Sequence, residues 1–598
     1  MQQHDFDILV VGGGGAGLRA SIAAAEQAQQ QGQTVSIGLV SKVYPMRSHT
    51  VAAEGGAAAV TRNDDSFAAH FEDTVAGGDW LSDQKVVDYF VRHAHQELVQ
   101  MERWGCPWSR KLDGSIQVRR FGGMKIERTW FAADKTGFHL LHTLFQTSLK
   151  FPAIKRLDEF FVLDLLVNDG HIAGVIALEV ATGILHLIRA KSVILATGGA
   201  GRLFRFNTNG GIVTGDGMAI AYRHGVPLRD MEFVQYHPTG LPGSGILITE
   251  ASRGEGGLML NKDGYRYLQD YGLGPETPLG QPKNKYMELG PRDKLSQAFW
   301  HEQKAGRTGK YGDSDVVYLD LRHLGKKYLH ERLPFICELA KSYVNIDPVH
   351  EPIPVRPAVH YTMGGITTDS QGETNIKGLY AVGECASVGL HGANRLGSNP
   401  LTELLVFGRL AGEQAVAHAQ IRAHSPLPQL QQQVQRQQKY LHNLTSGQGQ
   451  ESWVDIKRQL LRTMEEGCGI YRDEQGMQRT LNTIRALQAR YKNARVIDNS
   501  QSYNTELLNC IEVGFGLDVA EATCLAALER RESRGAHQRI DAGYDSRNDT
   551  DYLQHSLVYY QANNVARLEW QAVDTSILPP GVRAYGDAKQ NPSQGTTP

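Results

Sequence analysis

Apolar runs and glycines alternate at the start of the chain in an order that predicts strand, helix and strand. A short apolar run over residues 6–11 stops abruptly at glycines, and an alanine-rich stretch follows over residues 18–28. After Gly32, a second apolar run covers residues 35–40. Two short apolar runs separated by a helical stretch are typical of a βαβ unit. The opening of the chain therefore predicts an α/β protein with a Rossmann-like domain.

The texture of the sequence changes several times after this unit. Helical spacing is present over residues 85–103 and 136–150, and residues 160–195 contain apolar runs that look like a β-ribbon. Gly/Pro-rich loops between short helices occupy residues 242–355. A glutamine-rich run at 428–438 leads into helical periodicity up to about residue 532, which predicts a bundle of amphipathic helices.

These changes set the expected domain boundaries. Motifs of the first domain resume after residue 355, so the loop-rich stretch is interpreted as an insertion into it. We expect a cofactor-binding domain in two parts (1–241 and 356–420), an inserted α+β capping domain (242–355), a helical bundle domain (421–540) and a small C-terminal segment with a disordered tail (541–598).

Composition narrows the function classes. The chain has 598 residues, too many for one hydrophobic core, and a formal net charge of −2, which offers no basic field for nucleic acid. No apolar run reaches the roughly 18–20 residues that cross a bilayer. The N-terminus lacks the basic region and the twin arginine of export signals, so we expect a cytoplasmic protein without a direct membrane span.

The six cysteines stand singly, and none has the spacing of a metal, haem or iron–sulfur site. We expect reduced, mostly buried thiols and no metal on this chain. Any iron–sulfur cluster or haem that serves the protein must then belong to another chain.

A glycine-rich turn follows the first apolar run. Gly12, Gly14 and Gly17 fit the G-x-G-x-x-G pattern, with a strand before it, a helix after it and a second strand in place. Such glycines allow a tight turn and a close approach of the backbone to a pyrophosphate at a helix N-terminus. The acid that usually binds the ribose is replaced by Ser41, which either serves a ribose hydroxyl or lies in a simple turn.

Two later segments also place candidate cofactor-binding residues directly after an apolar run. Thr197 and Gly198 follow the apolar run that ends at Ala196, and Glu384 lies just beyond the run at 378–383. The first offers another close backbone approach, and the second offers an acid to a ribityl or ribose hydroxyl. With the glycine-rich turn, these segments indicate FAD rather than NAD.

Together these motifs resemble the fumarate reductase and succinate dehydrogenase flavoprotein family over nearly the whole chain, from residue 5 to about 585. The segments that carry the resemblance are Met46–Gly56, His237–Gly240, Thr249–Gly257, His360–Gly365, His391–Gly397 and Arg534–His537. The resemblance implies a Rossmann-like FAD-binding domain and an enzyme that interconverts fumarate and succinate.

The resemblance also implies how the flavin is held. His49 corresponds to the histidine that carries FAD covalently through the 8α-methyl group, a bond that raises the flavin potential. The implied FAD-binding positions are Gly12, Gly14, Gly15, Ala16, Gly17, Ser41, Lys42, Ser48, His49, Thr50, Glu54, Gly55, Gly56, Thr197, Gly198, Asp216, Tyr361, Glu384, Arg395, Ser398 and Leu401.

For the substrate, the resemblance implies a dicarboxylate site and a proton relay. The positions that match carboxylate-binding residues are His237, Thr249, His360 and Arg395. Arg292 matches the arginine that gives a proton to the substrate carbon, and Glu250 and Arg253 match the relay behind it. From the residues alone, Arg292 would instead be interpreted as a surface ion pair with Asp293.

Two positions bear on the direction of the reaction and on the sensitivity of the site to thiol reagents. Glu54 follows the pattern of reductase-type members, where dehydrogenase-type members have Gln, and a charged carboxylate there would lower the flavin potential. Ser252 replaces the Cys that relatives carry beside the relay arginine. We therefore expect thiol alkylation to leave the site active.

The resemblance implies partners as well as an activity. Fumarate reduction in anaerobic respiration requires electrons from an iron–sulfur subunit, which docks on membrane-anchor subunits at the cytoplasmic side of the bacterial inner membrane. The alternative is a succinate dehydrogenase that runs the same site in reverse. The covalent motif argues against L-aspartate oxidase, the missing export signal against periplasmic reductases, and the intact site residues against a flavin carrier without activity.

Overall fold

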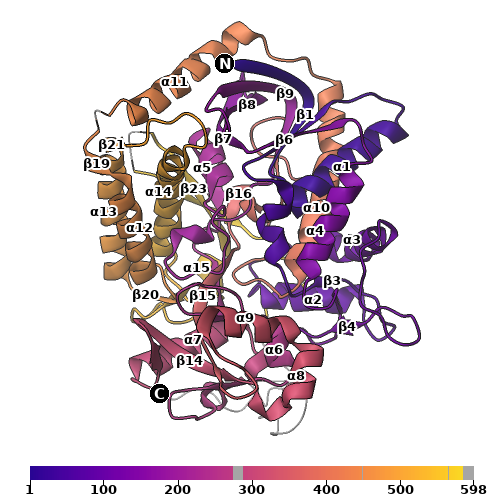
Figure 1. Cartoon of the computed structure of the whole chain (residues 1–598), viewed down its shortest axis with the longest axis vertical. Coiled ribbons are helices and arrows are strands. Elements are labelled where there is room, and N and C mark those ends of the chain that lie inside the picture. The colour runs from indigo at the N-terminus through magenta and orange to yellow at the C-terminus, as the bar shows by residue number, and fades with distance from the viewer. Residues whose placement is uncertain (274–286, 448, 563–564, 583–598) are drawn as a thin grey trace.

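A computed structural model describes residues 1–273, 287–447, 449–562 and 565–582. The expected tail after residue 582 and most of the loop at 272–282 lie outside these ranges. The described part consists of a sheet with helices beside it, a helical part on one side, and a smaller part below (Figure 1). No helix among the described residues is long and apolar enough to span a bilayer.

The main sheet has seven strands. In order across the sheet they are β6 (Ile154–Asp158), β2 (Ile37–Ser41), β1 (Gln2–Val11), β9 (Leu185–Leu195), β8 (His171–Glu179) and β7 (Phe160–Asn168), with β17 (Leu379–Ala381) also paired to β9. β1 and β2 are parallel, with Ile8 opposite Ile37, and helix α1 (Gly15–Gln30) connects them. The predicted βαβ unit and the predicted α/β fold class are confirmed.

The predicted β-structure of residues 160–195 is confirmed, because β7, β8 and β9 form antiparallel pairs, and this ribbon also joins the main sheet. β9 pairs antiparallel with β8 but also parallel with β1, for example Val10 opposite Ile194. The segment therefore extends the main sheet. Apolar periodicity predicts a strand, but it does not say which strand lies beside it.

The main sheet is buried on both faces. Successive side chains of a strand point to opposite sides of the sheet, and both sets are apolar in β1. Ile8 and Val10 belong to one apolar cluster, and Leu9 and Val11 belong to another. On the first side, α1 packs against α10 (Asn399–Gln420). On the second side the cluster continues into the helical part.

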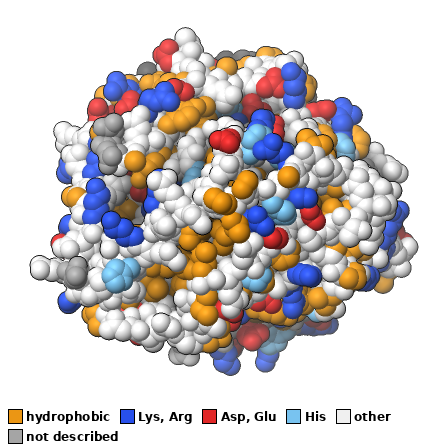
Figure 2. Space-filling model, turned by 90° about the horizontal axis from the view of Figure 1, so that it is seen from above, with side chains coloured by type: hydrophobic (Ala, Val, Ile, Leu, Met, Phe, Trp, Pro, Cys, Tyr) orange, Lys and Arg blue, Asp and Glu red, His pale blue; other side chains and the backbone are white. Residues whose placement is uncertain are grey.

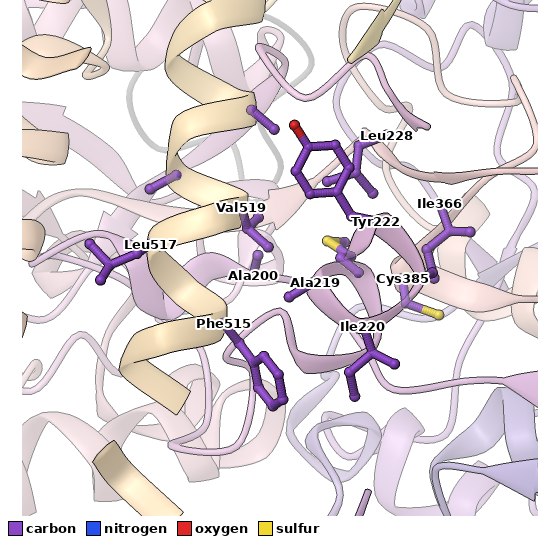
Figure 3. Close-up of a cluster of buried hydrophobic side chains, with 14 of the residues drawn as sticks. Ala200, Ala219, Ile220, Tyr222, Leu228, Ile366, Cys385, Phe515, Leu517 and Val519 are labelled. Carbon is purple, nitrogen blue, oxygen red and sulfur yellow. The ribbon is translucent and has the colours of Figure 1, made fainter. Parts of the chain in front are cut away.

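The helical part consists of α11 (Leu427–Thr445), α12 (Trp453–Gly467), α13 (Glu474–Tyr491) and α14 (Thr505–Glu529), as the periodicity predicts. α14 is buried along most of its length and lies against α5 (Asp216–Arg223). Figure 3 shows Phe515 and Val519 of α14 beside Ala219 and Ile220 of α5. The bundle thus packs directly on the domain that carries the glycine-rich turn.

The smaller part has its own apolar cluster and a sheet in the order β11 (Val234–Gly240), β15 (Ile353–Thr362), β14 (Ser314–Asp320), β12 (Leu258–Leu260). Its helices include α6 (Glu250–Gly254), α7 (Arg292–Lys304), α8 (Lys326–Arg332) and α9 (Pro334–Val344). The sheet runs across both expected domain boundaries, because β11 ends at Gly240 and β15 begins at Ile353. The proposed limit at 242 therefore falls just after one strand of this sheet, and the limit at 355 falls inside another.

The pairing of β11 with β15 is irregular at one point. Gln235 pairs with Tyr361 and Tyr236 pairs with Val359, so His360 is an extra residue on β15. Such a bulge bends the strand and redirects a side chain, and bulges are frequent next to active sites.

The face of the molecule seen from above carries charges of both signs (Figure 2). Figure 2 shows Lys and Arg side chains interspersed with Asp and Glu over the face seen from above, with apolar side chains between them. This distribution agrees with the net charge of −2.

A buried histidine fixes the turn that leads into β11. His555 of β23 (Gln554–Tyr559) lies 2.6 Å from Asp230 through Nδ1 and 3.3 Å from Asp83 through Nε2. Burial opposes a charge on His555, but the two carboxylates outweigh it and raise its pKa to about 9. His555 is therefore an imidazolium at neutral pH.

This histidine predicts a pH-dependent stability. Since the folded pKa lies above the ordinary value of 6.5, the stabilisation is fully present below pH 6.5 and is lost as the pH rises through about 9. The contribution is on the order of 3 kcal/mol. We expect the free energy of unfolding to fall between pH 7 and pH 10, and His555→Gln to lose that part of the dependence. Denaturant unfolding of the wild type and of His555→Gln across this pH range measures the two free energies. The control His350→Gln, at an exposed position, should keep the wild-type pH dependence.

Candidate active site

A cavity of about 620 Å³ opens at the carboxyl ends of the main-sheet strands. This is where open α/β sheets bind their ligands. All of the residues predicted from sequence line it except Gly17 and Arg253. Apolar residues that the sequence did not single out also line it, among them Phe121, Phe138, Ile246, Phe335 and Leu339.

The glycine-rich turn requires glycine at two of its three positions. A Cβ on Gly12 (φ +119°) would come within 2.1 Å of the Ala196 carbonyl oxygen. A Cβ on Gly17 would come within 1.8 Å of the Gly12 carbonyl oxygen. Gly17 therefore serves the packing of helix on strand, behind the cavity. α1 begins at Gly15, so its N-terminal N–H groups face the cavity, the arrangement that binds phosphate elsewhere.

Lys42 is held by protein groups at the edge of the cavity. Its Nζ lies 2.6 Å from Asp216, 2.8 Å from Glu512 and 3.1 Å from Thr214. These bonds join β2, α5 and α14. Lys42 and Asp216 thus connect the cavity wall with the helical part.

His49 stands at the start of a 3₁₀ turn, His49–Ala52. The backbone N–H of Gly210 donates to His49 Nδ1 at 3.3 Å. Burial lowers the pKa of His49 to about 4, so the imidazole is neutral at physiological pH. Nε2 is then the nitrogen that this bond leaves available.

Glu54 is protonated near neutral pH. Burial, and next the charge of Asp134, raise its pKa to about 8. The lowering of the flavin potential expected from a charged Glu54 therefore does not apply at pH 7. Sequence reasoning could not find this, because burial depends on residues far along the chain.

Several buried polar atoms around the cavity lack protein partners. Within the described ranges these atoms are Ser48 Oγ, Glu54 Oε2, Thr197 Oγ1, His237 Nε2 and Arg395 Nε. Buried polar groups are almost always hydrogen-bonded. The set therefore fits a polar ligand that extends from the glycine-rich turn to the far end of the cavity, as FAD and a small anion together would.

Two neutral histidines face each other at that far end. His237 and His360 have ring centroids 5.2 Å apart. Burial and then the nearby cation Arg292 hold the pKa of each well below its ordinary value. His237 Nδ1 accepts from the Thr239 N–H at 3.3 Å, which makes Nε2 the protonated nitrogen that can donate to a ligand.

Arg395 supplies a cation beside the histidines. Burial and the neighbouring Arg292 lower its pKa to about 9, so it stays charged at neutral pH. Its guanidinium lies over the Tyr361 ring, 4.2 Å from the centroid. The Tyr361 hydroxyl in turn donates to Glu403 at 3.2 Å.

Arg292 is buried at the start of α7, with 9% of its surface exposed. Its Nε donates to Glu250 Oε2 at 3.0 Å. The interpretation of Arg292 as a surface ion pair is therefore wrong. That interpretation relied on the neighbouring acid, Asp293. The Arg292 side chain, at the first residue of α7, instead turns inward to Glu250.

Glu250 lies between two arginines. Burial opposes its charge, but Arg292 and Arg253 outweigh burial and hold its pKa below the ordinary value. Arg253, which is fully buried, lies 3.7 Å from Glu250, and burial lowers its pKa to about 10. The backbone N–H of Gly122 also donates to Glu250. Arg292, Glu250 and Arg253 form a continuous row that starts at the cavity.

Sequence reasoning assigned no role to one glycine and two buried amides behind this row. Gly122 contacts Glu250, and Gln235 and Asn394 connect the two cavity arginines, as described below. The spacing of Gln235 two residues before His237 on a strand was the signal that could have found it, because both side chains point to one face.

Comparison with known proteins agrees with this fold. Residues 7–401 match the FAD binding domain family, and residues 457–585 match the fumarate reductase flavoprotein C-terminal family. The chain is 64% identical to the fumarate reductase flavoprotein subunit of Proteus vulgaris, over 98% of this chain and 97% of that one. It is 40% identical to the succinate dehydrogenase flavoprotein subunit of Rickettsia bellii, over 98% of both chains.

A solved structure of a quinol fumarate reductase from Escherichia coli superimposes with a TM-score of 0.95 at 63% identity, covering 98% of this chain and 99% of that one. By sequence and by fold, the chain therefore belongs to the fumarate reductase flavoprotein subunit family, whose members are oxidoreductases with an FAD-binding domain.

Proposed function

We propose that this chain is the catalytic flavoprotein subunit of a quinol:fumarate reductase, which reduces fumarate to succinate in anaerobic respiration. The observation that supports this most is the row Arg292–Glu250–Arg253, which begins in a cavity whose end also holds His237, His360 and Arg395. A buried cavity with this many donors favours a small dianion, and the row offers a route for a proton.

The cavity fits FAD as its cofactor. The N-terminus of α1 would hold the pyrophosphate, Ser48 and Thr197 would donate to polar atoms of the cofactor, and Glu384 would accept from a hydroxyl. When bound, the flavin supplies the hydride that fumarate accepts. His49 is proposed as the covalent attachment site, because its imidazole is neutral and its Nδ1 already accepts from Gly210.

The substrate carboxylates would be bound by four side chains. His237 and His360 donate as neutral imidazoles, Thr249 donates through its hydroxyl, and Arg395 offers the planar fork that matches a carboxylate. Strong donors on one carboxylate draw electron density from the double bond. They also stabilise the negative charge that develops on the substrate during reduction.

Arg292 would then protonate the substrate carbon. A guanidinium is a weak acid, but the acceptor is a strongly basic, carbanion-like carbon, so a weak acid suffices. The Glu250 carboxylate would accept a proton from Arg253, the next residue in the row, and pass it to Arg292 across the 3.0 Å bond. Each turnover would take one proton from this row, in addition to the hydride that the flavin supplies.

The alternative is a succinate dehydrogenase, which runs this chemistry in reverse. Identity of 64% to a fumarate reductase subunit against 40% to a succinate dehydrogenase subunit favours the reductase. Glu54 supports the same choice as a sequence pattern of reductase-type members.

The partners are part of the proposal. Electrons would arrive from an iron–sulfur subunit held on membrane-anchor subunits, at the cytoplasmic side of a bacterial inner membrane. The similar structures of quinol fumarate reductases support this assignment. The single cysteines of this chain offer no spacing for a cluster.

Replacement of the proton donor gives the first test. We expect Arg292→Gln to lower the rate of fumarate-dependent oxidation of reduced viologen by about 10²–10⁴-fold, because a positioned general acid contributes that much. Flavin content should stay at the wild-type level. Arg322→Gln, which breaks an ion pair with Asp320 outside the cavity, serves as the control. Wild-type protein that fails to oxidise the dye with fumarate would refute the proposed activity itself.

The attachment site is tested separately. His49→Ser should bind FAD that dissociates on denaturation, so the fluorescent flavin band of the wild type on a denaturing gel should disappear. Because the covalent bond raises the flavin potential, we expect succinate oxidation to fall more than fumarate reduction. The control variant His350→Gln should retain the fluorescent flavin band. A fluorescent band in His49→Ser would mean that another residue carries the flavin.

Thiol reagents test the role of Ser252. None of the six cysteines lines the cavity as the structure describes it, and Ser252 is buried beside Arg253. N-ethylmaleimide should therefore leave fumarate reduction within about twofold of the untreated rate, whereas Ser252→Cys should gain inactivation that fumarate prevents, since a nearby cation favours the thiolate. Substrate-protected inactivation of the wild type would contradict this reading.

A further inference from the structure

Gln235 is a fully buried amide that lies behind the cavity wall. Its Nε2 donates to Asn394 Oδ1 at 2.9 Å and to the Arg395 carbonyl oxygen at 2.9 Å. Its Oε1 accepts from Arg292 Nη1 at 3.3 Å. One side chain therefore bonds both to the proposed proton donor and to the backbone of the arginine proposed to hold a carboxylate.

The residues that Gln235 joins come from separate parts of the chain. Arg292 begins α7, Arg395 lies in the loop before α10, and Gln235 itself is on β11, two residues before His237. Asn394, which is also buried, donates to the Gly77 carbonyl oxygen at 3.4 Å, so the chain of bonds continues to the end of α2 (Phe67–Gly77). Gln235 is the member that spans the two arginines.

Only an amide satisfies all three partners of Gln235. A guanidinium has no acceptor and a carbonyl has no donor, so the oxygen of the amide must face Arg292 and the nitrogen must face Arg395. A carboxylate of the same shape would turn an oxygen towards the Asn394 and Arg395 oxygens. It would also put a second negative charge beside Arg292, which Glu250 already neutralises.

We propose that Gln235 is a positioning residue, which keeps the proton donor Arg292 and the carboxylate anchor Arg395 in a fixed relative position. The proposal rests on the proposed function of the cavity. Proton transfer to carbon requires that the donor lie over one atom of a substrate that the anchor holds by its far end. A displacement of about 1 Å between them costs up to about 10²-fold in rate.

The test uses the full chain with FAD bound, and all rates are expressed per bound flavin. Gln235→Met keeps the length of the side chain and removes its three bonds, and Gln235→Glu keeps the shape and adds a charge. Gln84→Met is the matched control. Gln84 is equally buried and also makes three bonds, all to the backbone of Ile577 and Leu578, away from the cavity.

The measurements are kcat and KM for fumarate, the pH profile of kcat, and the dissociation constant of malonate from the flavin spectrum. We expect Gln235→Met to lower kcat by 10-fold or more, on the order of 10–100-fold, with malonate affinity within about fivefold. In Gln235→Glu the alkaline limb of the profile should move to higher pH, because a second carboxylate stabilises the guanidinium cation. Gln84→Met should lower only the melting temperature.

A double variant tests the link from its other end. Asn394→Leu should lower kcat like Gln235→Met, and the combined variant should be at most about threefold slower than either, because both break one connection. If Gln235→Met does not retain flavin, Asn394→Leu decides the question alone. Variants whose kcat stays within twofold of the wild type, with an unchanged pH profile, would overturn the positioning role while the wild-type activity stands. Inactive wild type would instead overturn the proposed function, and the positioning role with it.

Discussion

The placement of positive charge inside a closed cavity is the constraint on which the site depends. Arg292 and Arg395 are buried within one cavity, and the Glu250 carboxylate lies 3.0 Å from Arg292 and 3.7 Å from Arg253. Burying a cation without a partner is costly, so an anion that enters the cavity relieves a penalty already present in the folded chain. The histidines stay neutral for the same reason, and they act as donors rather than as further charges. The proposed preference for a dianion would follow from the positive charge that the fold places in this cavity.

The framework around this cavity obeys local rules, and those rules made it predictable. Gly12 and Gly17 are required by contacts of backbone with backbone, and β1 and β2 are parallel because α1 connects them. The helical part between α11 and α14 follows from its spacing of apolar residues. Each of these features is decided within a few tens of residues, so the sequence shows it directly.

The features that escaped prediction are decided by distant contacts. Asp293 beside Arg292 suggests a surface pair, yet α7 turns Arg292 towards Glu250. The sequence suggests that Glu54 is charged, but burial raises its pKa to about 8, so the group is mostly protonated at pH 7. Gln235 carries no motif of its own, and its three partners lie in other segments. The resemblance to a known family supplied most of the site residues, whereas their charge states and their connections came only from the fold.

The sheet β11-β15-β14-β12 has a mechanical consequence. His237 and His360 lie on its two strands nearest the main domain, and these strands are hydrogen-bonded through β14 to the outer strand β12. His49 and the turn at Gly12–Gly17 belong to the other body. Any tilt of this sheet would carry both imidazoles together and leave their mutual spacing intact, while it changed their separation from the flavin-binding turn. The position of both histidines relative to that turn would thus depend on a single variable, the orientation of this sheet.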